Sequence, residues 1–357
     1  MQVNLDELDR SIAGDDDADK APETNATLAA LLDARRFDID KPPPPAVPVF
    51  SLRKAVIATS GNLVSVQGKA KAGKSAFLSA LIASTMEPDK DCLWLVSENK
   101  NGFALIHIDT EQSPHDHHQL VRRALRRAGK DRPPAWLRSF SLADVPATQR
   151  RAALAVEVER AQAACGGVLA VIIDGVGDLC PVLNDPKEEL AFVDELHQMA
   201  IQFQTVIVCV LHENPSSDAG KMRGHLGSQL ERKAETPLRL EKNADGVTTI
   251  FADRARHCHL PKESGACFAW CDEAQMHVSV ASARDTKLED RKDELRTFAE
   301  EVFRDADAPF GLPWADMHRR IETLAQLKPD GARKRFAMLL KLKVVNKTDA
   351  GKYRLSK

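Results

Sequence analysis

The sequence of 357 residues contains a single tyrosine, Tyr353, and aromatic residues make up only 5% of it. Proteins that hold single-stranded nucleic acid by stacking its bases need several aromatic side chains along one groove. The composition therefore argues against a stacking platform of the OB-fold kind. A groove for a nucleic-acid strand would have to depend on backbone and cationic contacts.

Long apolar runs are also missing. No run approaches the ~20 residues that a membrane helix needs. The acidic N-terminus lacks the charged-then-apolar plan of a signal peptide, so we expect a cytoplasmic protein without membrane contact. The seven cysteines are an odd number and are scattered through apolar segments. This pattern favours reduced thiols over a disulfide framework.

Two histidine-rich segments look like metal sites but lack the spacing for one. Residues 115–118 are adjacent at an expected helix start, where neighbouring side chains point in different directions, so we predict a surface helix start. His257, Cys258 and His259 alternate along an expected strand near Cys267 and Cys271, and no Cys-X-X-Cys pair is present. A zinc site is therefore not predicted.

Charge is distributed unevenly, although the formal net charge is only −2. Residues 1–40 hold eleven acidic and four basic residues, whereas residues 328–357 hold ten basic and two acidic ones. The acidic stretch is too polar to bury a core, and the prolines at 42–45 and 48 form a stiff linker. We expect an acidic, disordered arm and linker over 1–47, an α/β domain over 48–283 and a separate domain over 284–357.

Apolar runs and helical patterns alternate from residue 49 to about residue 282, which is typical of a layered α/β sheet. The expected strands are 63–66, 93–96, 103–108, 168–173 and 205–211, with shorter antiparallel strands at 238–240, 247–251 and 267–271. The expected helices are 76–86, 117–128, 148–164 and 188–203.

A phosphate-binding loop follows the first of these strands. It consists of Gly68, Lys69, Ala70, Lys71, Ala72, Gly73, Lys74 and Ser75, and Ala76 begins the next helix. In such a loop the backbone N–H groups surround the phosphates, the lysine reaches the β- and γ-phosphate oxygens, and the serine hydroxyl ligates Mg²⁺. The N-terminus of the following helix adds its own attraction for anions. ATP and Mg²⁺ are therefore the predicted ligands, and an ATPase is the predicted activity.

Three polar residues at strand ends complete the candidate site. Asp174 ends a buried strand and is the predicted carboxylate on the Mg²⁺ side, although an Asp-Gly turn would place it there too. Glu111 lies just past another strand end and is predicted to orient the attacking water, while Asp109 is expected to be structural. The alternative for Glu111 is a capping acid before Ser113. His212 ends a further strand and either senses the γ-phosphate or serves as a turn residue.

The order of these features resembles the RecA-like ATPases, and more narrowly the hexameric replicative helicases of the RepA and DnaB kind. The resemblance covers roughly residues 49–280. It implies a RecA-like P-loop NTPase core, a catalytic role for Glu111 and a γ-phosphate sensor at His212. It also implies a homo-oligomer, a hexameric ring, acting on single-stranded DNA as a DNA-dependent ATPase and DNA helicase in DNA replication. The loop at 213–225 stands where the family carries a mobile DNA-contacting loop.

The same resemblance gives roles to two arginines and one helix. Arg256 stands where family members carry an arginine finger that reaches the neighbouring subunit's γ-phosphate, with Arg254 as its companion; the alternative is two residues on a solvated strand edge. A short helix expected at 26–37 would dock on an adjacent subunit. The sequence shows no primase domain, and its acidic N-terminal segment is unlike the bulky helical domain of the DnaB kind. The size and the single ATPase core therefore resemble more closely the RepA-type AAA family ATPases of plasmids and mobile elements. An ATP-switched DNA-binding regulatory or partitioning protein stays open as the alternative.

The basic C-terminal segment resembles a winged helix. Helical patterns at 312–324 and 331–340 precede two short strands around Asp349 to Gly351. By this resemblance Arg333, Lys334 and Arg335 lie on the recognition helix and contact DNA phosphates, since cationic contacts provide most sequence-independent affinity. The alternative is a charged, solvated helix in a protein-contact module.

Overall fold

The computed structural model describes residues 25–180, 185–213, 224–304 and 311–356. The chain divides into two units, Met1–Ala46 and Val47–Lys357. The described residues leave out most of the expected acidic arm, and they include only the ends of the expected DNA-contacting loop. Among the described residues, no helix is long and apolar enough to cross a bilayer.

The first unit contains one described helix, α2 (Asn25–Ala34), which is three residues shorter at its C-terminal end than the helix expected at 26–37. The three leucines that were expected to share a face, Leu28, Leu31 and Leu32, are all exposed.

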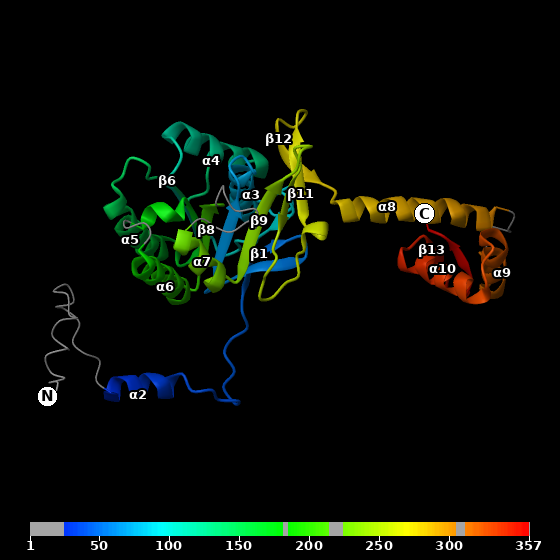
Figure 1. Ribbon diagram of the computed structural model, residues 1–357, viewed down its shortest axis with the longest axis horizontal. Helices are drawn as coiled ribbons and strands as arrows, with labels where there is room; N and C mark the ends of the chain where they lie inside the picture. Colours follow the sequence, from blue (N-terminus) through cyan, green and yellow to red (C-terminus); the bar gives the residue numbers. More distant parts are fainter. Residues whose placement is uncertain (1–24, 181–184, 214–223, 305–310, 357) are drawn as a thin grey trace, which may run out of the picture. The chain divides into compact units, whose positions relative to one another are not determined.

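A mixed sheet forms the centre of the second unit (Figure 1). It has nine strands in the order β12-β11-β10-β9-β3-β8-β7-β5-β6. The six strands from β9 to β6 are parallel, and β10, β11 and β12 continue the sheet as antiparallel strands. The parallel strands are β3 (Leu63–Gly68), β5 (Ala104–Asp109), β6 (Leu137–Ser141), β7 (Val168–Asp174), β8 (Val206–His212) and β9 (Thr236–Lys242). The others are β10 (Thr248–Phe251), β11 (Ala266–Cys271) and β12 (Met276–Val280). This arrangement fits the RecA-like P-loop core that the sequence predicted.

Helices cover both faces of the sheet because the inner strands are apolar on both sides. Side chains of β3 and β5 that face one way pack on α3 (Lys74–Met86) and α4 (Pro114–Ala128). Those that face the other way pack on α5 (Ala147–Cys165), α6 (Pro186–Phe203) and α7 (Gly224–Lys233). Buried parallel strands of this kind appear in a sequence as continuous runs of Val, Ile and Leu, which is why these strands could be predicted. A small antiparallel sheet joins β1 (Pro48–Leu52), β2 (Ala55–Thr59) and β4 (Leu95–Val96).

Beyond the sheet, α8 (Ala283–Phe303) leads to a group of elements with its own apolar core. The group consists of α9 (Trp314–Ala325), α10 (Pro329–Lys341) and the antiparallel pair β13 (Val345–Lys347) and β14 (Tyr353–Leu355). Phe336 on α10 packs edge-on against Tyr353, with ring centroids 4.9 Å apart. Two 3-10 turns, Val176–Leu179 and Lys262–Ser264, complete the described elements.

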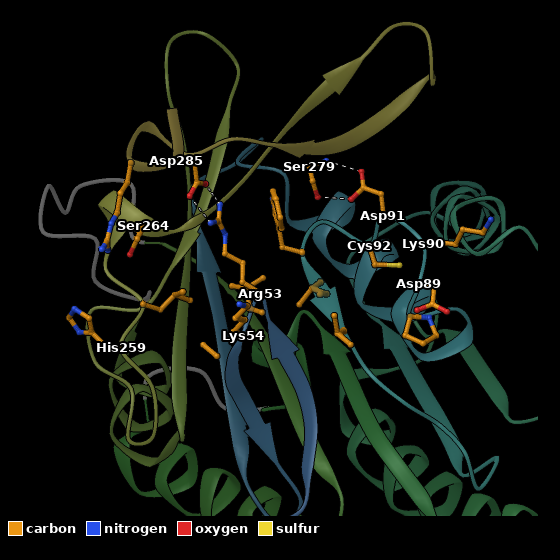
Figure 2. A pocket seen from close by; sticks show the side chains of 18 residues that line it. Arg53, Lys54, Asp89, Lys90, Asp91, Cys92, His259, Ser264, Ser279 and Asp285 are labelled. Carbon is orange, nitrogen blue, oxygen red and sulfur yellow. Dashed lines mark hydrogen bonds and ion pairs between the residues drawn. The ribbon is translucent and has the colours of Figure 1, made fainter. Parts of the chain in front are cut away.

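The start of α8 is fixed to the β1–β2 turn by an ion pair. The Arg53 guanidinium donates to both oxygens of the Asp285 carboxylate, at 3.1 and 2.6 Å, and stacks on the Trp94 ring 4.5 Å away. Asp285 also caps α8 through Ser282, and the hydrogen bond from Arg53 holds the pKa of Asp285 well below its usual range. The pair lies beside a cavity of about 880 Å³ (Figure 2), past the end of α3 that is far from the phosphate loop.

Candidate functional site

The phosphate loop has a conformation that requires glycine at position 73. Gly73 is left-handed, with φ +94°, and its missing Cβ would lie 2.9 Å from Cζ of Phe268, so a side chain would fit neither the backbone nor the space. The Thr248 hydroxyl donates to the carbonyl oxygen of Ala72 over 3.1 Å, which ties the loop to β10. Lys69, Ala70 and Lys71 are exposed, whereas Ala76 is buried in the first turn of α3. A cavity of about 430 Å³ separates the loop from the end of β9.

Lys74 turns back onto the loop and toward β8. Its Nζ lies 2.9 Å from the carbonyl oxygen of Gly68 and 3.0 Å from Nδ1 of His212. Burial lowers the pKa of Lys74, although the carboxylates of Glu111 and Asp174 oppose this shift. A phosphate group would replace these neutral partners with anionic oxygens and would stabilise the ammonium form.

His212 connects Lys74 to Glu111. Its Nε2 lies 2.9 Å from Oε2 of Glu111. An ammonium group can only donate hydrogen bonds, so Nδ1 of His212 accepts from Lys74 and the proton of a neutral ring sits on Nε2, where it is donated to Glu111. The three residues that the sequence placed on separate strands and loops therefore form one continuous hydrogen-bonded chain.

Asp174 is buried and is the last residue of β7, which pairs with β5. Glu111 follows the end of β5, so the two carboxylates lie at the same end of the parallel strands. Burial, together with the nearby carboxylates of Asp109 and Glu111, raises the pKa of Asp174 to about 7. A divalent cation beside this carboxylate would reverse the effect by favouring the ionised form. The Ser75 hydroxyl and the Asp174 carboxylate are hard oxygen ligands of the kind that Mg²⁺ prefers, so these residues fit the ion.

Arg254 and Arg256 are both exposed, and Arg256 lies away from this group. The backbone N–H of Arg256 donates to the carbonyl oxygen of Glu235, just before β9, and its guanidinium donates to the carbonyl of Lys233 at 3.1 Å. Glu235 in turn pairs with Leu63, the first residue of β3, whereas the phosphate loop leaves β3 at its last residue. A strand of this length spans roughly 17 Å at ~3.3 Å per residue. Arg256 therefore lies near the N-terminal ends of the parallel strands, whereas the phosphate loop of its own chain lies at their C-terminal ends.

Two residues of the site were not foreseen. Gln112, next to Glu111, donates from Nε2 to Asp109 and to Asp174 over 2.9 and 3.0 Å. His117 was expected at a surface helix start, but it is buried and its Nδ1 lies 3.2 Å from Oδ2 of Asp109. That expectation is wrong for His117 because α4 turns this one position of its first turn onto the sheet. Asp109 itself holds the loop by accepting from the backbone N–H groups of Glu111 and Gln112.

The loop, the lysine and the acidic strand ends define a nucleotide-binding protein of the P-loop NTPase class. A family model described as an AAA domain matches residues 38–218, about half of the chain, and the chain belongs to this family. No curated protein matches the chain. Membership of the family supports the binding and hydrolysis of a nucleotide.

The Lys74 side chain is the part of the loop whose loss should weaken nucleotide binding most. A hydrogen bond to a charged group contributes about 1.5–3 kcal/mol, so we expect Lys74→Ala to weaken MgATP binding by roughly 10- to 100-fold. Lys187→Ala is the matched control, because it removes an exposed lysine from the start of α6, outside the phosphate loop. Isothermal titration calorimetry would compare the two variants, and equal losses would contradict the assignment.

Gly175, which follows Asp174, should resist substitution for steric reasons. Its φ is +90°, and a Cβ there would lie 2.3 Å from Oγ1 of Thr110 and 2.7 Å from Cγ of Glu111. Gly166 has a similar φ of +70° with nothing within 4 Å of its Cβ position. Both alanine variants carry the left-handed strain, but only Gly175→Ala adds overpacking, so its unfolding free energy should fall by about 1–3 kcal/mol more. Urea denaturation would test the difference, which should vanish only if the side chains of both Thr110 and Glu111 move freely.

Proposed function

We propose that the protein is an oligomeric DNA-dependent ATPase, a helicase of the RepA type that hydrolyses ATP with Mg²⁺ to move on single-stranded DNA. The observation that supports it best is the chain from Lys74 through His212 to Glu111. It connects the phosphate loop to the residue proposed to activate water, and a γ-phosphate entering the loop would compete for Lys74. His212 would then shift its hydrogen bond, which is how a strand-end residue reports on nucleotide.

The position of Arg256 supports action in an oligomer. A cation supplied by a neighbour stabilises charge in the phosphoryl-transfer transition state. Arg256 is exposed near the N-terminal ends of the parallel strands, away from the phosphate loop of its own chain. It is therefore available to an adjacent subunit and not to its own site. A closed ring, with six subunits by the resemblance, would give every loop such a partner.

The C-terminal group of elements is proposed to be a winged helix that contacts DNA. Three helices followed by an antiparallel strand pair are present in the required order. Of the three basic residues assigned to phosphate, Arg333 and Lys334 are exposed on α10. Arg335 instead stacks on Phe298 of α8, 4.1 Å from the ring, so we assign the phosphate contacts to Arg333 and Lys334.

Replacing Arg333 and Lys334 together by alanine should weaken DNA binding uniformly across sequences. Two lost phosphate contacts would lower the slope of log affinity against log salt by about 2 for duplex DNA. Arg319→Ala on α9 is the control, since this exposed arginine lies in the same group of elements. Fluorescence anisotropy at several salt concentrations would measure the slopes, and unchanged slopes would favour the protein-contact alternative.

ATP turnover with and without single-stranded DNA tests the function as a whole. A severalfold stimulation by DNA is the expected result, followed by strand displacement from a forked duplex. Stimulation without displacement would reduce the proposal to a translocase. Turnover that ignores DNA would instead support the ATP-switched binding protein that regulates or partitions DNA.

A further inference from the structure

A buried polar cluster lies between β5, β6, β7 and the first turn of α4. His107 and Asp109, two positions apart on β5, point to the same face of the sheet and are fully buried. The His107 ring stacks on His117, with centroids 5.2 Å apart and an angle of 8° between the planes. Ser139 on β6 lies between the two rings, with Oγ 2.9 Å from Nδ1 of His107 and 3.1 Å from Nε2 of His117.

With both imidazole rings neutral, the hydrogen bonds place the protons of this cluster. The Asp109 carboxylate only accepts, so Nδ1 of His117 donates to it and Nε2 of the neutral His117 ring carries a lone pair. The single hydroxyl proton of Ser139 is therefore donated to His117. Oγ of Ser139 then accepts from His107, which places the proton of the neutral His107 ring on Nδ1. Nε2 of His107 is left with a lone pair.

That lone pair is buried and unused. Nε2 of His107 has no hydrogen-bond partner among the described residues. Nδ1 of the ring faces Ser139 on β6, and β5 lies between β6 and β7, so the opposite side of the ring faces β7. Asp174 ends β7 directly beside Asp109. A histidine whose Nδ1–H is held by a hydrogen bond while Nε2 is bare has the form that binds metal ions in proteins.

The three groups already lie close to the spacing of a metal site. One ligand atom from each of His107, Asp109 and Asp174 lies within 4.8 Å of the others. Ligand atoms of one tetrahedral ion at 2.0–2.2 Å are about 3.4 Å apart, so the three groups would close their separations by up to about 1.4 Å to share an ion. The Gln112 amide now donates to both carboxylates. It thus satisfies the two acidic groups that a cation would otherwise neutralise.

We propose that His107, Asp109 and Asp174 form a binding site for a divalent transition-metal ion, which enters when the Gln112 side chain swings out. One imidazole nitrogen and two carboxylate oxygens suit Zn²⁺, Co²⁺, Mn²⁺ or Fe²⁺ better than Mg²⁺, which prefers oxygen ligands alone. Among the described residues, Gln112 is the half-exposed side chain that donates to both carboxylates. The site does not depend on ATP hydrolysis, but an ion there would occupy Asp174 and so compete with the Mg²⁺ of the phosphate loop.

Titration of the full-length protein with Co²⁺ in excess Mg²⁺, without nucleotide, tests the site through the visible absorption of the ion. We expect one tight equivalent without a thiolate charge-transfer band, because the ligands contain no sulfur. His107→Gln should weaken binding at least tenfold, a loss typical of damaged metal sites. Gln112→Ala should strengthen it severalfold, since the competing amide is gone. His118→Ala, which removes an exposed imidazole from the same helix, should change nothing.

Unchanged affinity in His107→Gln would overturn the proposal, as would a spectrum dominated by cysteine ligation. Should His107→Gln fail to fold, as judged by circular dichroism, the Gln112→Ala variant decides: equal or weaker Co²⁺ binding there would refute the site. Because every measurement is made without ATP, a failure of the site leaves the proposed ATPase function untouched.

Discussion

Arg256→Ala should lower ATP turnover by about 10³-fold or more, the effect of removing an arginine supplied to a phosphoryl-transfer site. The affinity for ATP should stay nearly unchanged, because the guanidinium lies at the end of the parallel strands opposite the phosphate loop of its own chain. Steady-state turnover and equilibrium binding of a fluorescent ATP analogue would separate the two quantities. Arg160→Ala, which removes an exposed arginine from α5, is the matched control.

Mixing two inactive variants makes this test specific. A Lys74→Ala subunit has a damaged loop but an intact Arg256. In a mixed oligomer this Arg256 would complete the site of a neighbouring Arg256→Ala subunit, whose loop is intact. In a random equal mixture about a quarter of the sites would combine an intact loop with an intact neighbour, since interfaces in such rings are head-to-tail. Recovered activity near that level would support action between subunits. A mixture as inactive as its components would remove Arg256 from the site.

Glu111→Gln should lower turnover by about 10²- to 10⁴-fold, the usual contribution of a general base. The amide oxygen can still accept a hydrogen bond from Nε2 of His212, now 2.9 Å from the carboxylate, so the Lys74–His212 contact and ATP binding should survive. The variant would then hold ATP without hydrolysing it. Single-turnover chemistry and binding measured on one preparation would show this separation.

Asp116→Asn provides the control for Glu111→Gln. Asp116 is an exposed acid five residues further on, engaged with Ser113 at the start of α4. Its loss should leave the rate within a fewfold of the wild type. Full activity in Glu111→Gln would show instead that Glu111 serves to hold His212, and the water would need another base.

The parallel strands and the phosphate loop were predictable because their signals are local. The buried run ending in Asp174 and the glycine-rich segment at 68–75 each occupy a few consecutive residues. The strand β6 was missed because every one of its residues is only half-buried, which leaves no apolar run to detect. Strands β1, β2 and β12 were missed as well, and they lie in the smaller sheet or at the edge of the large one.

The polar contacts within the site were harder to foresee because they depend on distant pairings. Gln112 looked like an ordinary loop residue, and its contact with Asp174 bridges 62 positions in the sequence. The apolar run containing His107 gave no hint that Ser139, 32 positions away, would hold its ring. Helical periodicity likewise placed Arg335 on α10 but could not tell that its side chain faces Phe298 of α8.

The separation of Arg256 from Lys74 along the sheet has a consequence for how activity would depend on assembly. If Arg256 completes a neighbouring site, an open row of n subunits has one loop without a partner, whereas a closed ring has none. The rate per subunit would be zero for a monomer, about half its maximum for a pair, and would reach the maximum only on closure. Dilution would therefore abolish ATP turnover without unfolding the protein, and the concentration of subunits would set the rate of turnover per subunit.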